Sequence, residues 1–129
     1  MIFVDTNVVM YAVGRSHPLR DEARAFFAQH VEAPWGLVTS AEVQQELLHA
    51  YLPVGRMTTL DSALTLIDNC VGQVWSVEPD DARLARLLVD RFAGLGARDL
   101  LHLACCRRRK VVEIKTYDRA LAAAASSRS

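Results

Sequence analysis

Short apolar runs alternate along the chain with longer segments of helical periodicity, and this alternation predicts the secondary structure. The short runs predict strands over residues 2–4, 37–39, 74–77 and 111–115. Segments whose apolar residues recur every three or four positions predict helices near residues 7–13, 18–30, 41–51, 57–70, 79–92, 98–108 and 118–125. Because helices rather than tight hairpin turns join the strands, we expect an α/β fold with a parallel sheet and helices on both faces.

Residues that favour helix starts support several of these boundaries. Pro18 and Pro79 stand at the first positions of predicted helices, where proline is tolerated. Ser40 is placed to cap the helix that follows it. The chain contains no internal repeat, low-complexity segment or convincing linker. We therefore expect a single domain over residues 1–129, in which residues 126–129 form a frayed tail.

Composition narrows the class of protein. Hydrophobic residues make up 51% of the chain, which is enough for a core, but no stretch approaches the roughly 20 apolar residues of a membrane helix. The N-terminus lacks the basic and apolar regions of a signal peptide. Lys plus Arg and Asp plus Glu both number 15, so net charge neither favours nor excludes a nucleic-acid partner. The three cysteines suit neither a disulfide framework nor a metal knuckle, and a reducing cytoplasm is the simplest interpretation.

Two carboxylates lie just beyond the ends of predicted strands. Asp5 comes after the first strand, and Asp118 comes shortly after the fourth. In open parallel sheets, ligands bind outside the carboxyl ends of the strands. We therefore expect Asp5 and Asp118 to meet at one edge of the sheet.

Two further carboxylates lie on predicted helices. Asp99 begins a helix that is apolar on most sides, where a charge is costly unless something compensates it. On the helix over residues 41–51, a rotation of about 100° per residue places Glu46 roughly 80° and Glu42 roughly 120° from the centre of the apolar stripe. Glu46 is thus the better candidate for an interior site, and Glu42 is its rival.

Each of these acids also has an ordinary explanation. Asp99 can serve only as a helix-start residue, Asp118 as a cap, Asp5 as a turn residue, and Glu46 can face water. Carboxylates brought together repel one another, and each raises the pKa of its neighbours. A hard divalent cation such as Mg²⁺ or Mn²⁺ relieves that repulsion, and these ions prefer carboxylate and water oxygens.

Four segments occur in series along the chain: "FVDTNVVMYA", "TSAEVQQELLHAY", "ARDLLHLACC" and "IKTYDRAL". Together they resemble the PIN-domain ribonucleases, and more narrowly the VapC toxins of bacterial type II toxin–antitoxin systems. The resemblance runs from residue 1 to about residue 122, with the motifs in family order. It implies a three-layer PIN-like fold, with a short parallel sheet of four or five strands flanked by helices.

The resemblance also implies an activity and partners. Such proteins are Mg²⁺-dependent endoribonucleases, in which Mn²⁺ can substitute, and they cut tRNA, rRNA or mRNA. A VapB-type antitoxin holds them inactive in a hetero-oligomer, and they commonly form homodimers. By this resemblance Asp5 and Asp99 are the principal metal-binding acids, and Glu46 and Asp118 complete the catalytic and metal-binding set.

Several polar residues near the acids have supporting roles by the same resemblance. Thr6, Asn7 and Thr116 occupy positions that support the acids or the metal-bound water. His102, one turn beyond Asp99, carries two interpretations: a general base, or a packed histidine hydrogen-bonded near the core, which we favour. We expect the antitoxin to present an arginine or lysine to the acidic site.

A basic run is the candidate for binding the RNA backbone. It comprises Arg107, Arg108, Arg109 and Lys110. The alternative is a solvated helix end, where cations are favoured by the helix dipole. Arg15, Arg20 and Arg56 are further candidates.

Two other functions remain open from the sequence. A receiver-like phosphoacceptor domain also places acids at strand ends and binds Mg²⁺, although that pattern requires paired acids after the first strand, where this chain has only Asp5. The other alternative is a catalytically silent PIN-like module that only binds a partner. The presence of all four acids speaks against it.

Overall fold

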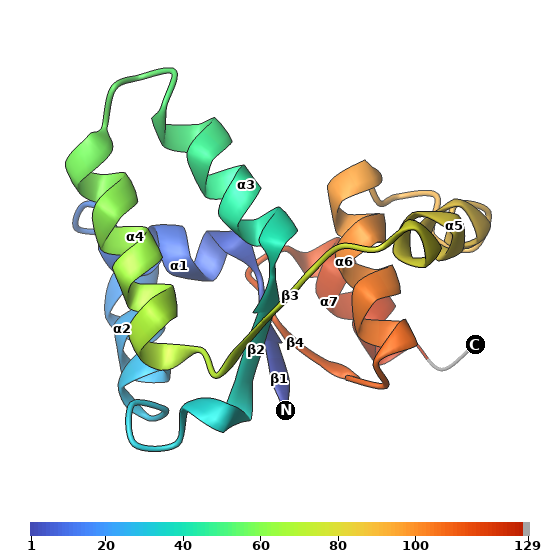
Figure 1. Cartoon of the computed structure of the whole chain (residues 1–129), viewed down its shortest axis with the longest axis horizontal. Coiled ribbons are helices and arrows are strands. Elements are labelled where there is room, and N and C mark those ends of the chain that lie inside the picture. The colour runs from blue at the N-terminus through green and yellow to red at the C-terminus, as the bar shows by residue number, and fades with distance from the viewer. Residues whose placement is uncertain (128–129) are drawn as a thin grey trace.

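The computed structural model describes residues 1–127, and it places a parallel sheet between two groups of helices (Figure 1). The strands are β1 (Ile2–Val4), β2 (Leu37–Ser40), β3 (Gln73–Trp75) and β4 (Glu113–Lys115). They pair in the order β3-β2-β1-β4, and every pairing is parallel. Since β1 lies between β2 and β4, segments from the start, the first third and the end of the chain meet at the sheet.

Helices cover both faces of the sheet, as predicted. On one side lie α1 (Thr6–Val13), α2 (Pro18–Ala28), α3 (Ala41–Tyr51) and α4 (Met57–Cys70). On the other side lie α5 (Pro79–Leu88), α6 (Ala97–Arg108) and α7 (Arg119–Ser126), and a short 3₁₀ turn (Pro34–Gly36) precedes β2. The predicted α/β class and three-layer arrangement are confirmed. Among residues 1–127, no helix combines the length and apolar character needed to cross a membrane.

The core divides in the same way as the helices. The larger apolar cluster joins the sheet to α1–α4 and includes Phe3, Val38 and Ile67. The smaller cluster lies among α5, α6 and α7, around Leu103 and Leu121. Because α6 contributes to both clusters, its position relative to β1 is fixed by packing on two sides.

Some boundaries differ from the prediction for local physical reasons. β4 begins at Glu113 rather than at residue 111, because the Val111 amide still donates a hydrogen bond to the Cys106 carbonyl at the end of α6. Lys110, at φ 60, provides the left-handed residue that turns the chain there. α5 ends at Leu88 rather than near residue 92, since the next residues form a turn that closes on the Leu88 carbonyl.

Two further predictions concern helix ends: the Ser40 cap at the start of α3, and the frayed tail after α7. Ser40 stands at the start of α3, but its hydroxyl makes no capping bond and is buried without a partner among residues 1–127. α7 continues through Ser126, one residue into the predicted frayed tail. Residues 128–129 of that tail lie outside the described residues.

Candidate metal centre

All four predicted acids line one hollow of about 500 Å³ at the carboxyl ends of the strands. We call it the acidic hollow; it is lined by Asp5, Glu46, Asp99 and Asp118 together with Thr6, Asn7, Met10, Gly96, Ala97 and Arg98. The acids come from the end of β1, from α3, from the start of α6 and from the segment after β4. Because the strands are parallel, their ends and the helices that follow them converge at one edge.

Asp5 is held in place by the chain on both sides of its carboxylate. Its Oδ1 accepts a hydrogen bond from the Thr6 amide at 2.8 Å, and its Oδ2 accepts one from the Thr116 hydroxyl at 2.7 Å. Only 5% of Asp5 is exposed. Burial raises the pKa of the Asp5 carboxyl, although His102 and these two hydrogen bonds oppose the rise.

Thr116 links two of the acids. While its hydroxyl donates to Asp5, the same oxygen accepts from the Asn7 side-chain amide at 3.3 Å and from the Asp118 backbone amide at 3.0 Å. The Asn7 carbonyl oxygen in turn accepts from the amide of Tyr117 at 3.2 Å. The predicted supporting residues Asn7 and Thr116 therefore join the end of β1 to the segment after β4.

Asp118 combines an ordinary structural role with its place in the hollow. Its Oδ1 caps α7 by accepting from the Leu121 amide at 3.0 Å. The capping explanation is thus correct for Asp118, but it does not remove the residue from the acidic hollow, whose wall it forms. The cap orients the carboxylate by using one of its oxygens.

Glu46 reaches the hollow from α3, and two residues contact its two oxygens. The Thr6 hydroxyl donates to Oε2 at 2.7 Å, and His102 Nε2 lies 2.6 Å from Oε1. Burial by itself raises the pKa of Glu46, but its contacts with His102 and Thr6 outweigh burial and hold that pKa below its ordinary value. The helical-face argument for Glu46 over Glu42 agrees with this placement, because Glu42 does not line the hollow among the described residues.

His102 is fully buried on α6, and its ring packs 5.4 Å from that of Phe3. Its Nε2 also lies 3.6 Å from Asp5 Oδ1, so it sits between two acids. Burial lowers the pKa of His102, but Glu46, Asp5 and Asp99 outweigh that effect and raise it. The favoured interpretation of a packed histidine agrees with its position, yet neither ring nitrogen has a well-aligned hydrogen-bond partner within residues 1–127.

Burial and three acidic neighbours act together on Asp99. Its burial, together with the charges of Asp5, Asp118 and Glu46, raises its pKa from 3.8 to about 6. Burial removes the water that would solvate the Asp99 charge, and the neighbouring acids add repulsion to that cost. The acidic hollow therefore carries negative charge that the chain itself compensates only in part.

The donor set fits a hard divalent cation. Single ligand atoms of Asp5, Glu46 and His102 all lie within 4.8 Å of one another, and Asp99 and Asp118 line the same hollow. Carboxylate oxygens in an open, solvent-connected cleft are the ligands that Mg²⁺ and Mn²⁺ prefer. A bound cation of this kind also lowers the cost of ionising Asp99.

Sequence reasoning did not single out Arg98 or Met10 for this site. Arg98 precedes Asp99 and lines the hollow with its exposed side chain, where its charge helps to lower the pKa of Glu46. Met10 follows Asn7 by one helical turn on α1 and lies on the same wall. Their positions in the sequence could have indicated both residues. Met10 shares a helix face with Asn7, and Arg98 shares the first turn of α6 with Asp99.

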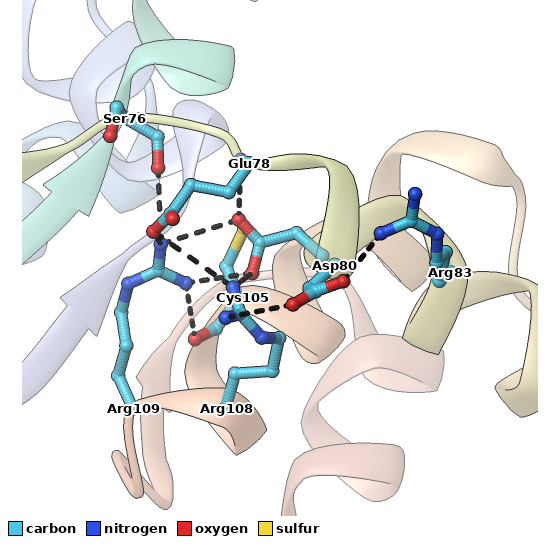
Figure 2. A network of polar contacts seen from close by, with 8 residues as sticks. Ser76, Glu78, Asp80, Arg83, Cys105, Arg108 and Arg109 are labelled. Carbon is cyan, nitrogen blue, oxygen red and sulfur yellow. Dashed lines mark hydrogen bonds and ion pairs between the residues drawn. The ribbon is translucent and has the colours of Figure 1, made fainter.

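The basic run at the end of α6 lies outside the acidic hollow, and two of its members are engaged elsewhere (Figure 2). Arg108 and Arg109 both contact the buried Asp81 carboxylate, at 2.7 and 2.9 Å. Arg109 also donates to the carbonyls of Cys105 and Ser76 (Figure 2). These guanidinium groups join α6 to α5. Binding of RNA by the basic run stays a prediction, and the contacts of Arg108 and Arg109 with Asp81 do not favour it.

Comparison with known proteins places the chain in a family. The model of the PIN domain matches residues 2–126. Ribonuclease VapC23 of Mycobacterium tuberculosis is 62% identical over 124 residues, which cover 96% of this chain and 98% of that protein. Ribonuclease VapC13 of the same organism is 35% identical over 119 residues, covering 92% and 91%.

A solved structure agrees at the level of the fold. The crystal structure of Mycobacterium tuberculosis VapC20, described as a Sarcin-Ricin loop cleaving toxin, superposes with a TM-score of 0.78 at 20% identity, covering 96% of this chain and 95% of that one. The α/β architecture, the acidic hollow and the full-length similarity to VapC23 lead to one assignment. The chain belongs to the PIN domain family, and within it to the VapC proteins.

Proposed function

We propose that this protein is a metal-dependent endoribonuclease toxin, which hydrolyses phosphodiester bonds in RNA with Mg²⁺, or Mn²⁺ in its place. The observation that carries the proposal is the convergence of Asp5, Glu46, Asp99 and Asp118 on one hollow, with the pKa of Asp99 raised to about 6 by its burial and its acidic neighbours. Four carboxylates held together at such a cost are expected where a cation binds. The related proteins VapC23 and VapC13 are named as ribonucleases, which supports the same activity.

The residues of the acidic hollow would have two kinds of role, binding the cation and orienting the groups that bind it. Asp5 and Asp99 would hold the cation, with Glu46 and Asp118 as further ligands or as the groups that orient the attacking water. When bound, such a cation lowers the pKa of water and neutralises charge on the phosphoryl group. Thr116 orients Asp5, while Thr6 and His102 orient Glu46.

Cleavage of purified RNA tests the proposal. Wild-type protein is incubated with total tRNA and rRNA, with Mg²⁺ or with EDTA, and the RNA ends are sequenced. Cleavage should require the metal and should be lost in Asp5→Asn, Asp99→Asn and Glu46→Gln. Glu42→Gln is the matched control, because it removes a carboxylate from the same helix as Glu46 without touching the hollow. Metal-independent cleavage, or full activity after Asp5→Asn, would refute the assignment.

The same experiment decides between this activity and a silent binding module. A silent module would bind a partner but cleave none of these RNAs. A receiver-like phosphoacceptor is no longer a competitor, since the chain belongs to the PIN domain family.

We further propose that a VapB-type antitoxin neutralises the enzyme in the cytoplasm, in a hetero-oligomer built on a toxin homodimer. The partly compensated negative charge around Asp99 supports an antitoxin that inserts an arginine or lysine into the acidic hollow. Co-expression with the reading frame adjacent to the toxin gene should yield a stable complex. Replacing the inserted cation with alanine should restore cleavage, whereas a complex without a cation near Asp5 and Asp99 would contradict this mode of inhibition.

A further inference from the structure

A second hollow of about 450 Å³ adjoins the acidic hollow, and the two share Asn7 and Met10 as walls. It is formed by the rest of α1, the loop that follows α1, the end of α3 and the connection to α4. We call it the cationic hollow, because Arg15 and Arg56 line it. Among residues 1–127, no aspartate or glutamate lines it.

The two arginines are available to a ligand, unlike Arg108 and Arg109. Both side chains are exposed, and neither forms an ion pair with a described residue. Arg56 lies 5.6 Å over the Tyr51 ring and donates one N–H to Thr59 at 3.3 Å, which positions it while leaving other donors unused. Guanidinium groups placed this way suit the oxygens of a phosphate.

Aromatic rings stand beside these cations. The rings of Tyr11 and His17 pack with centroids 4.7 Å apart, and Tyr117 contacts the Tyr11 ring edge-on at 5.5 Å. The His17 ring is fixed, because its Nδ1 accepts a hydrogen bond from the Leu19 amide at 3.0 Å. Ordered planar side chains next to guanidiniums provide the two kinds of surface a nucleotide needs, one for its base and one for its phosphate.

One face of α1 connects the cationic hollow to the acidic hollow. Asn7, Met10 and Gly14 follow one face of α1, and at 1.5 Å per residue this face advances about 10 Å from the acidic hollow toward Arg15. A short stretch of extended single-stranded RNA bridges such a length. An acidic peptide would pair with the cations but would make no use of the rings or of the continuity with the acidic hollow.

We propose that the cationic hollow binds a nucleotide of the RNA next to the cleaved bond, with Arg15 and Arg56 on its phosphate and the Tyr11–His17 pair against its base. This subsite rests on the proposed ribonuclease function and names where the substrate is held. It assigns RNA recognition to α1 and the α3–α4 connection rather than to the end of α6.

Binding measured without cleavage tests the subsite. A short fluorescein-labelled single-stranded RNA is titrated in EDTA against wild type, Arg15→Gln, Arg56→Gln and the double variant, with anisotropy recorded at several salt concentrations. The double variant should bind about tenfold more weakly, and the slope of its salt dependence should fall by about 0.7 for each phosphate that is no longer neutralised. Arg86→Gln is the matched control, since it removes an exposed arginine from α5, which lies across the sheet from α1 (Figure 1).

The outcomes separate the subsite from the enzyme activity. If the protein cleaves RNA but the double variant binds and cleaves like Arg86→Gln, the subsite is wrong while the ribonuclease stands. If RNA binds through Arg15 and Arg56 but is never cleaved, the ribonuclease is wrong while the subsite stands. A polyglutamate peptide serves as the rival probe, and its binding through Arg15 and Arg56 in place of RNA would overturn the proposal in favour of an acidic protein partner. Equal melting temperatures of all variants exclude a folding defect.

Discussion

His102 Nε2 lies 2.6 Å from Oε1 of Glu46, and this pairing joins the buried side of α6 to the acid that α3 contributes. Thr6 holds the other oxygen of the same carboxylate at 2.7 Å. Residues of two other helices thus contact both oxygens of Glu46, and Thr6 makes the aligned hydrogen bond. A carboxylate restrained in this way loses little conformational freedom when it acts on a cation or on water.

Replacing His102 should therefore weaken metal binding through Glu46. We expect His102→Leu to lower Mn²⁺ affinity about 10- to 100-fold, measured by calorimetry, because one of the two groups that orient Glu46 is removed. His102→Gln keeps an N–H donor and should recover part of this affinity. Thr6→Val should act in the same direction, with Thr6→Ser as its control. Unchanged affinity in both His102→Leu and Thr6→Val would show that Glu46 needs neither neighbour.

Adding metal should stabilise the folded protein. Ligand at about 100 times its dissociation constant raises the free energy of unfolding by about 2.7 kcal/mol. We expect Mg²⁺ to raise the melting temperature of the wild type in a thermal scan, and to have little effect on Asp5→Asn or Asp99→Asn. Glu42→Gln should respond like the wild type, and a response of equal size in all four proteins would place the ion elsewhere.

The pH dependence of stability should reveal the raised pKa of Asp99. Because the folded state shifts this pKa from 3.8 to about 6, the folded protein binds the proton more tightly than the unfolded chain. The contribution of Asp99 to stability is therefore full below about pH 4 and is lost as pH rises through about 6. Melting temperatures in EDTA should fall less steeply over this window in Asp99→Asn than in the wild type. Parallel curves for the two proteins would contradict the shift.

The Asp81 network should matter for stability rather than for catalysis (Figure 2). Burial alone raises the pKa of Asp81, but Arg109, the Glu78 amide and Arg108 outweigh it and hold the pKa well below its usual range. Its stabilising effect is thus present above the ordinary Asp pKa and is lost only in strong acid. Asp81→Ala leaves two guanidiniums without their buried partner, so we expect the free energy of unfolding in urea to fall by about 3–5 kcal/mol.

The control is an exposed ion pair at the edge of this network, on the same helix. Arg83 and Asp80 are in contact at 2.6 Å, but most of each side chain is in water (Figure 2). Arg83→Ala should therefore cost less than about 1 kcal/mol. Equal losses of stability in Asp81→Ala and Arg83→Ala would mean that burial does not set the strength of the network.

The types of the secondary-structure elements and their order along the chain could be predicted from the spacing of apolar residues. A helix or strand that buries one face has regularly spaced apolar residues. The strand over residues 2–4 and the apolar face of the helix that carries Glu46 could therefore be predicted from spacing alone. The placement of Asp5 and Asp118 at one edge also followed, because parallel strands end on the same side of a sheet.

Contacts between side chains that are distant in the sequence could be assigned only from the folded structure. The basic run was visible in the sequence, but the commitment of Arg108 and Arg109 to Asp81 depends on how α5 packs against α6. The two partners of Glu46 and the cationic hollow beside Arg15 likewise arise where α1, α3 and α6 converge. Which partners a long side chain contacts depends on the distances between helices and strands in the folded protein. Those distances are set by packing of the whole core rather than by the local periodicity of the sequence.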